Sequence, residues 1–137
     1  MEENFSILIY KTSTSGILSL RITSDWIEYK RVIRTRKKDG AGFDEEEQAP
    51  KMLTDDVLIY RIYKELYLPR KRALDADYKG LNTADPRELG YVKSSSRTKL
   101  NIVDGDFTCD FDLACKKYAE TAKELARDIL QLVQEKI

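Results

Sequence analysis

Apolar and polar residues alternate most regularly near the N-terminus, where the pattern predicts strands. Between residues 17 and 23, an extended chain would present one wholly apolar face made of Leu18, Leu20 and Ile22. A period of two residues with one apolar face is typical of a half-buried strand. Phe5–Tyr10 and Trp26–Thr35 are similar in composition, and Ser24-Asp25 between them is a turn sequence. We therefore predict an antiparallel meander of three strands, with a polar loop over 11–16.

A second hairpin followed by a helix is predicted at the C-terminal end. Thr98–Val103 and Phe107–Phe111 are strand-like runs joined by a turn, Asp104-Gly105-Asp106. From about Asp112 onward apolar residues recur every three or four positions, which predicts an amphipathic helix of about 25 residues and about 37 Å. We expect this helix to close one end of the sheet. Its last turns would then be available to a partner through their apolar residues, Leu130, Val133 and Ile137.

The segment 57–68 fits two different elements. Thr54-Asp55-Asp56 would serve as the cap and first turn of a helix. The segment itself is rich in β-branched and aromatic residues, which are favoured in strands. We favour the strand, and Pro69 ends the element in either case.

Long loops are predicted on both sides of that segment, at about 36–51 and 70–96. In the first, a basic run with glycines is followed by an acidic run, and the two partly neutralise each other. In the second, Pro86 fits the first turn of a short helix around Asp85–Leu89. Residues 91–93 would add a short strand.

The composition describes one globular domain over residues 1–137. The chain is 42% hydrophobic and 35% charged. A domain of this length buries roughly two-thirds of its unfolded surface. With the predicted strands and helix, the fold class is α+β: a strongly bent antiparallel sheet or partial barrel capped by the C-terminal helix. Lys and Arg total 24, as do Asp and Glu, so only a local patch could attract an anionic partner.

Several kinds of chemistry are missing from the sequence. Histidine is absent, which removes the commonest general base and the commonest metal ligand. Cys109 and Cys115 cannot form a zinc site alone, and we expect both to pack as small apolar groups. Asp104-Gly105-Asp106 lacks the following Gly and the distal Glu of a calcium loop. We therefore expect no enzyme activity, no metal and no cofactor.

The sequence also lacks signals for export or membrane insertion. Met1-Glu2-Glu3-Asn4 is acidic and short, without the basic and apolar regions of a secretory signal. No apolar run approaches the roughly 20 residues that span a bilayer. We therefore expect a cytoplasmic protein with no membrane span.

The predicted strands and turns carry a family resemblance. Gly16–Thr23 and Ser24–Lys30 match the loose opening pattern of bacterial pleckstrin-homology and GRAM-type domains, G-x-Φ-x-Φ-T-x-D-x-Φ-x-Φ, where Φ is apolar. Thr54–Val57 is similar to the segment that often starts the next strand, and Lys99–Phe111 with the following helix resembles the end of such domains. The chain thus resembles a pleckstrin-homology-like domain. This resemblance implies a non-catalytic binding module with a protein or peptide partner.

Two basic clusters are candidate binding sites for an anionic ligand. One belongs to a run at 30–38 and the other follows Pro69; their members are Arg34, Arg36, Lys37 and Lys38, and Arg70, Lys71 and Arg72. Cationic side chains bind phosphate and carboxylate groups. A small anion- or nucleotide-binding protein is therefore the alternative function, and it gains support if folding brings the two clusters together.

The tyrosines of the central segment are candidates for the core or for a partner surface. Tyr60, Tyr63 and Tyr67 are spaced three and four residues apart. Tyrosine is suited to both uses, because its ring can be buried while its hydroxyl stays hydrogen-bonded. Core packing is favoured, and a partner surface is the alternative. Assembly into a homo-oligomer through the C-terminal helix is a further alternative.

Overall fold

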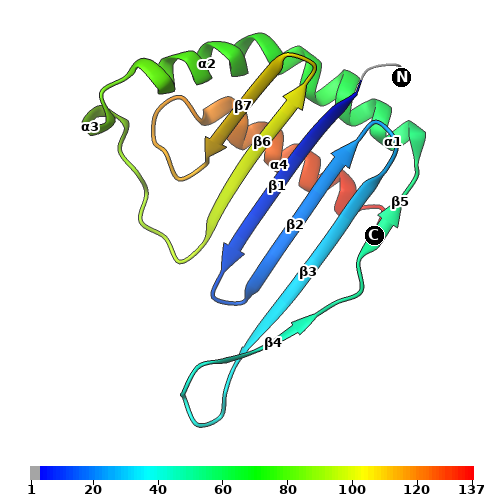
Figure 1. Cartoon of the computed structure of the whole chain (residues 1–137), viewed down its shortest axis with the longest axis vertical. Helices are drawn as coiled ribbons and strands as arrows, with labels where there is room; N and C mark the ends of the chain where they lie inside the picture. The colour runs from blue at the N-terminus through cyan, green and yellow to red at the C-terminus, as the bar shows by residue number, and fades with distance from the viewer. Residues whose placement is uncertain (1–3) are drawn as a thin grey trace.

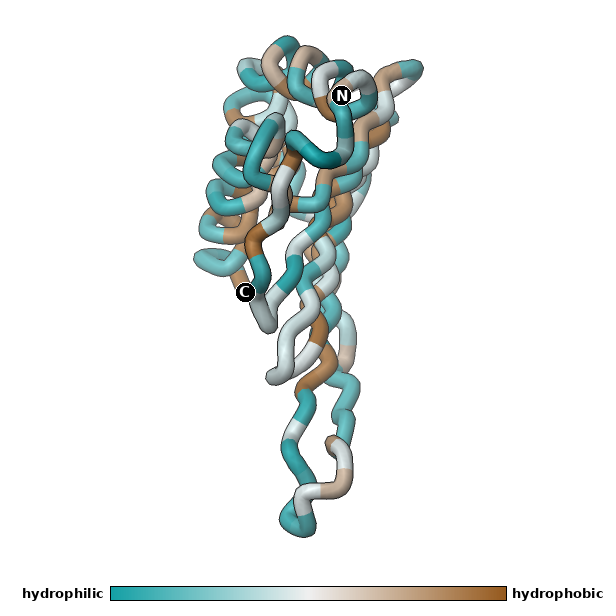
Figure 2. The backbone as a smooth tube through the Cα atoms, turned by 90° about the vertical axis from the view of Figure 1, so that its left-hand side faces the viewer, coloured by the Kyte–Doolittle hydropathy of each residue, from teal (hydrophilic) through white to brown (hydrophobic). Residues whose placement is uncertain are grey.

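An antiparallel sheet with helices on one of its faces makes up the fold (Figure 1, Figure 2). The computed structural model describes residues 4–137. The strands are β1 (Phe5–Ser13), β2 (Gly16–Thr23), β3 (Ile27–Arg36), β4 (Phe43–Glu47), β5 (Lys51–Leu53), β6 (Arg97–Asp104) and β7 (Phe107–Asp112). Their order is β4-β3-β2-β1-β6-β7, and β5 also pairs with β3. The predicted α+β class with an antiparallel sheet is confirmed, and the sheet is not closed into a barrel.

The predicted meander is confirmed by the pairing of β1, β2 and β3. Leu20 lies opposite Ile9 on one side and Tyr29 on the other. The turn between β1 and β2 is tighter than the predicted loop, because β1 continues to Ser13. A side chain at Gly16 would not fit, since its Cβ would lie 1.9 Å from the carbonyl oxygen of Val32.

The segment 57–68 is helical, so the favoured strand is wrong. The helical elements are α1 (Asp56–Tyr60), η1 (Arg61–Tyr67), η2 (Leu68–Arg70), α2 (Lys71–Thr83), α3 (Pro86–Leu89) and α4 (Glu120–Gln134). Asp55 caps α1, accepting a hydrogen bond from the amide of Leu58 at 3.0 Å. Burial outweighs the strand propensity of the β-branched and aromatic residues, because helical spacing sends Ile59, Ile62 and Tyr63 into the core.

Pro69 does not end the helix, contrary to expectation. The helical elements from α1 to α2 follow one another without a break, and Pro69 lies inside them. Proline has no amide hydrogen and crowds the carbonyl four residues earlier. The helical turn before Pro69 is therefore wider than in an α-helix, and the amide of Leu68 donates to the carbonyl of Tyr63, five residues earlier. The turn after Pro69 is tighter, and the amide of Lys71 donates to the carbonyl of Leu68, three residues earlier.

Both predicted loops contain regular structure. About half of the second is α2, and only the short helix within it, α3, was predicted; Asp85 caps α3 by accepting a hydrogen bond from the amide of Arg87. Of residues 91–93, only Tyr91 forms a β-bridge, to Cys115. Part of 36–51 belongs to β4 and β5, which both pair with β3. The acidic β4 lies opposite the basic end of β3. The hairpin of β3 and β4 projects beyond the helices (Figure 2).

The C-terminal helix is shorter than predicted. It begins at Glu120 instead of near Asp112, and it has 15 residues. Residues 113–119, between β7 and α4, are not helical. Tyr118 among them has a φ of 62°, which interrupts helical geometry. Val133 is fully buried, Leu130 is only partly buried against the core, and Ile137 is 39% exposed, so the last turns present less apolar surface than expected. Because the helix is shorter, its last turns help to cover the sheet, and Val133 is buried there.

The core lies between one face of the sheet and the two long helical segments. Fully or almost fully buried residues from the strands include Ile7, Ile9, Leu20, Ile22, Ile27, Leu100, Ile102 and Phe111. The helices contribute Leu58, Ile62, Tyr63, Tyr67, Leu74, Leu125, Ile129 and Val133. Cys109 and Cys115 are buried and unpaired, as predicted for small apolar groups. Cys115 lies in the turn after β7 and not in the helix.

Candidate functional site

The helices cover only part of the sheet face on which they pack. In Figure 2 all helices lie on one side of the sheet, and the strands continue well beyond them. On that uncovered part, Lys11 lies opposite Leu18 of β2 and Thr98 of β6, and Leu18 lies opposite Arg31 of β3. These residues belong to the same face as the buried Ile9 and Leu20, because side chains two apart on a strand share a face. They form a floor beside α4.

One flank of α4 forms a wall along this floor. Two hollows meet there, one of about 490 Å³ and one of about 220 Å³, and both are lined by Lys11 and Gln134. We call the two together the groove. Its wall consists of Lys123, Ala126, Arg127, Leu130, Gln131 and Gln134, and its floor includes Lys11, Leu18, Tyr29, Arg31, Thr98 and Leu113.

The charges of the groove all have one sign. Lys11, Arg31, Lys123 and Arg127 line it, and none of its lining residues, all within 4–137, is acidic. The first three form no ion pair with any residue in that range. Arg127 is 70% exposed and pairs with the neighbouring Asp128, at 3.4 Å. A concave surface lined by cations of one sign raises the local concentration of anions.

The groove is also partly apolar. Leu18, Tyr29, Leu113 and Leu130 are partly buried and pack against the core. Their remaining exposed surface lies between the cations. Apolar area surrounded by polar and charged groups is typical of a surface that binds another protein.

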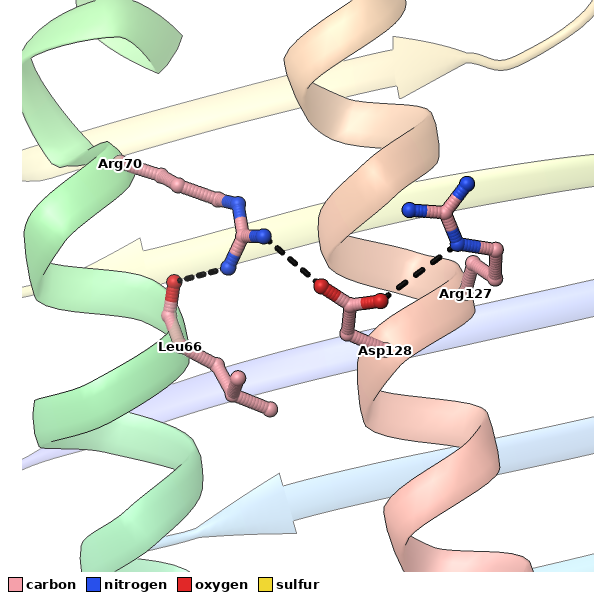
Figure 3. Close-up of polar contacts among 4 residues, drawn as sticks. All are labelled: Leu66, Arg70, Arg127 and Asp128. Atoms are coloured by element: carbon pink, nitrogen blue, oxygen red, sulfur yellow. Dashed lines mark hydrogen bonds and ion pairs between the residues drawn. The ribbon is translucent and has the colours of Figure 1, made fainter.

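An ion pair between helices fixes the position of the wall (Figure 3). Arg70 donates to Asp128 of α4 at 2.7 Å and to the carbonyl of Leu66 at 2.8 Å. Both charged side chains are about a quarter exposed, so solvent screens the pair only in part. The pair joins the distorted helix around Pro69 to α4, on the flank of α4 that faces away from the groove.

A buried carboxylate joins the sheet to the same helix. Asp104, at the end of β6, is 7% exposed. It accepts hydrogen bonds from the hydroxyls of Tyr67 at 2.9 Å and Tyr63 at 3.2 Å, and from Lys71 at 3.3 Å. Burial raises the pKa of Tyr67 far above its ordinary value, and Asp104 raises it further, so this hydroxyl stays protonated and donates. We interpret this cluster as a structural clamp, because its tyrosines are buried.

The predicted anion-binding residues do not come together. Arg36, Lys37 and Lys38 are exposed at the projecting end of β3, far from η2 and α2 (Figure 1), and Arg34 pairs with Glu45 at 2.9 Å. In the other cluster, Arg70 and Lys71 bind Asp128 and Asp104. Arg72 is exposed, with no ion pair to residues 4–137. The condition that would have favoured a shared anion site is therefore not met.

The tyrosines divide between the core and the surface. Tyr63 and Tyr67 are in the core, with ring centroids 5.4 Å apart, as favoured. Tyr60 is 52% exposed on the outer side of the helix. Of the groove residues, Leu130 was predicted as part of a partner surface and Arg31 belongs to the basic run at 30–38, but the other lining residues were not selected from the sequence. The sequence does contain an indication of the groove. Lys11 and Arg31 are cations at positions that belong to the apolar faces of their strands.

No protein-family model matches the sequence, and no curated protein matches it. The resemblance to pleckstrin-homology-like domains therefore stays a prediction. Within residues 4–137 no helix has the length and apolar character needed to cross a membrane.

Proposed function

We propose that the chain is a non-catalytic binding module, and that its groove takes a carboxylate-bearing segment of a partner protein. The observation that carries this proposal is the combination of four cations with a partly apolar floor and no acidic lining residue. Opposite charges across an interface speed association and select the partner, while buried apolar area supplies much of the affinity. An acidic segment with apolar side chains is complementary on both counts.

The spacing of the cations favours a protein segment over a single small anion. Lys11 and Arg31 are two strands apart, which separates their backbones by about 10 Å. Lys123 and Arg127 are about 6 Å apart along α4. Charges distributed in this way match several carboxylates along a chain better than one phosphate group.

Selection from a random library of short displayed peptides tests the proposal. The wild-type protein is the bait, and the variant Lys11→Glu/Lys123→Glu is used to remove peptides that bind elsewhere. The enriched peptides should be rich in Asp and Glu and should also contain apolar residues. Fluorescence anisotropy should show binding that weakens with salt, because exposed charges are screened.

A matched control separates the groove from general charge. Reversal of two exposed lysines outside the groove, Lys64→Glu/Lys93→Glu, gives the same change in net charge. The groove variant should bind the peptides about tenfold more weakly or worse, since each exposed pair contributes up to about 1 kcal/mol and becomes repulsive. The control should bind normally. Equal loss in both variants, or enriched peptides without carboxylates, would contradict the proposal, and displacement by free phosphate alone would support the small-anion alternative.

A further inference from the structure

The groove runs across the strands and not along an edge of the sheet. From the residue that follows β7 as far as β3, its floor is formed by neighbouring residues, Leu113, Thr98, Lys11, Leu18 and Arg31. Four steps of about 4.8 Å between neighbours give a floor about 19 Å long. Anything that follows the groove therefore lies across four or five strands, beside α4.

The backbone amide and carbonyl groups of the central strands in this floor are already paired within the sheet. β1 is hydrogen-bonded to β2 and β6, and β2 to β1 and β3, so the central strands are paired on both sides. An extended peptide laid across them could form no ladder with the sheet, and its own amide and carbonyl groups would be left unpaired where water is excluded. A helix satisfies its backbone internally and presents only side chains.

The packing of α4 on the sheet shows how such a segment would pack. α4 lies on the same sheet face and buries residues at helical spacing, Ala122, Leu125, Ala126, Ile129 and Val133. The next position along the sheet, on the groove side of α4, has no helix. Neighbouring helices pack with their axes 8–10 Å apart when small residues allow it, and the wall contains Ala126. The vacant strip of sheet therefore has the surroundings of a helix site.

We infer that the groove accepts an acidic amphipathic helix of about 13 residues from a partner protein, laid across the strands beside α4. This inference rests on the proposed function and specifies its partner. A floor of about 19 Å corresponds to about 13 residues at 1.5 Å per residue. Apolar side chains of the partner helix would face Leu18 and Leu130, and its carboxylates would face the four cations. Its apolar positions should recur every three or four residues.

The test uses the peptides that the library selection enriches. Their apolar residues should be three and four positions apart, and their circular dichroism should become more helical on binding. A proline at the centre of such a peptide should weaken binding about tenfold or more, because it breaks the helix. Proline at the first position, where a helix tolerates it, should have little effect.

Two substitutions on the protein locate the helix beside α4. Gln134 is exposed and lines both hollows, whereas Glu135 is exposed and lines neither. Gln134→Trp should fill the groove and weaken binding about tenfold or more, while Glu135→Trp should leave binding within about twofold. Full binding by Gln134→Trp would overturn the location.

The possible failures are distinguishable. Acidic peptides with alternating apolar residues, whose binding is insensitive to a central proline, would overturn the helix and leave the proposed function intact. If no peptide distinguishes the wild type from Lys11→Glu/Lys123→Glu, both the helix and the proposed function are wrong. Helical spacing, sensitivity to proline and loss of binding in Gln134→Trp together support both.

Discussion

Tyr67→Phe tests whether the buried carboxylate clamps the long helix to the sheet. The substitution keeps the ring, which packs 5.4 Å from the ring of Tyr63, and removes only the hydroxyl. That hydroxyl is fully buried and donates to Asp104 at 2.9 Å. We therefore expect a loss of stability without a cavity, so that the change reports on one hydrogen bond.

The expected magnitude follows from the surroundings of Asp104. A hydrogen bond to a charged group contributes roughly 1.5–3 kcal/mol. After the substitution the carboxylate keeps its bonds from Tyr63 at 3.2 Å and Lys71 at 3.3 Å, so it is not left unpaired. The loss should lie near the lower limit, about 1.5–2 kcal/mol. With a urea dependence of about 2 kcal/mol per molar, the midpoint should fall by about 0.8–1 M.

Urea unfolding followed by the fluorescence of Trp26, the single tryptophan, measures this loss. Tyr60→Phe is the control, because Tyr60 is half exposed on the same helix and should change stability by less than about 0.5 kcal/mol. A midpoint for Tyr67→Phe equal to that of the wild type would refute the clamp. An equal loss in both variants would show that the effect is not specific to the carboxylate.

The pH dependence gives an independent measurement on the same variant. Burial and Asp104 raise the pKa of Tyr67 above its ordinary value of 10.0. The unfolded chain therefore releases this proton first, so stability is complete below about pH 10 and falls as pH rises further, by at most about 1.4 kcal/mol per pH unit. Tyr67→Phe should show a shallower fall than the wild type. Parallel curves for the two proteins would contradict the shifted pKa.

Three further predictions concern the rest of the fold. Arg70→Met should lower the free energy of unfolding by about 1–2 kcal/mol, because it breaks the partly buried pair between the helices, whereas Arg72→Met should have no effect in the same urea assay. Burial raises the pKa of the Cys109 thiol to about 12 from 9.0, so stability should fall as pH rises above 9, and the difference in urea midpoint between the wild type and Cys109→Ala should narrow from pH 8 to pH 11. Gly16→Ala should cost about 3 kcal/mol or more, since the new Cβ would overlap the carbonyl of Val32 in a backbone conformation with positive φ; an unchanged melting temperature would contradict this.

Local patterns in the sequence predicted the parts of the fold that depend on neighbours along the chain. The alternation of Leu18, Leu20 and Ile22 reports directly on a half-buried strand. The helix at 57–68 was predicted as a strand because it is rich in β-branched and aromatic residues, which are favoured in strands. What decides between them is burial against the sheet, a contact with distant residues that no short window contains.

The groove was missed for a related reason. Lys11 and Arg31 extend apolar strand faces, and the sequence does not say how far the helices will cover those faces. The position of α4 decides this, and it depends on Asp128 meeting Arg70, 58 residues away. The sequence therefore predicted binding sites at cations that are adjacent along the chain. The structure instead brings together four cations from three separate segments, β1, β3 and α4.

The neutrality of the whole chain is compatible with a charged groove because its charges are separated in space. The acidic residues of β4 lie opposite the basic end of β3, where Arg34 pairs with Glu45. The groove cations have no such acidic neighbour among its lining residues. At physiological salt this field extends only about 8 Å, so it acts on a partner that is already near the surface. Charge reversal in the groove should therefore slow association and reduce its salt dependence, whereas changes to the apolar floor, such as Leu18→Ala, should mainly speed dissociation.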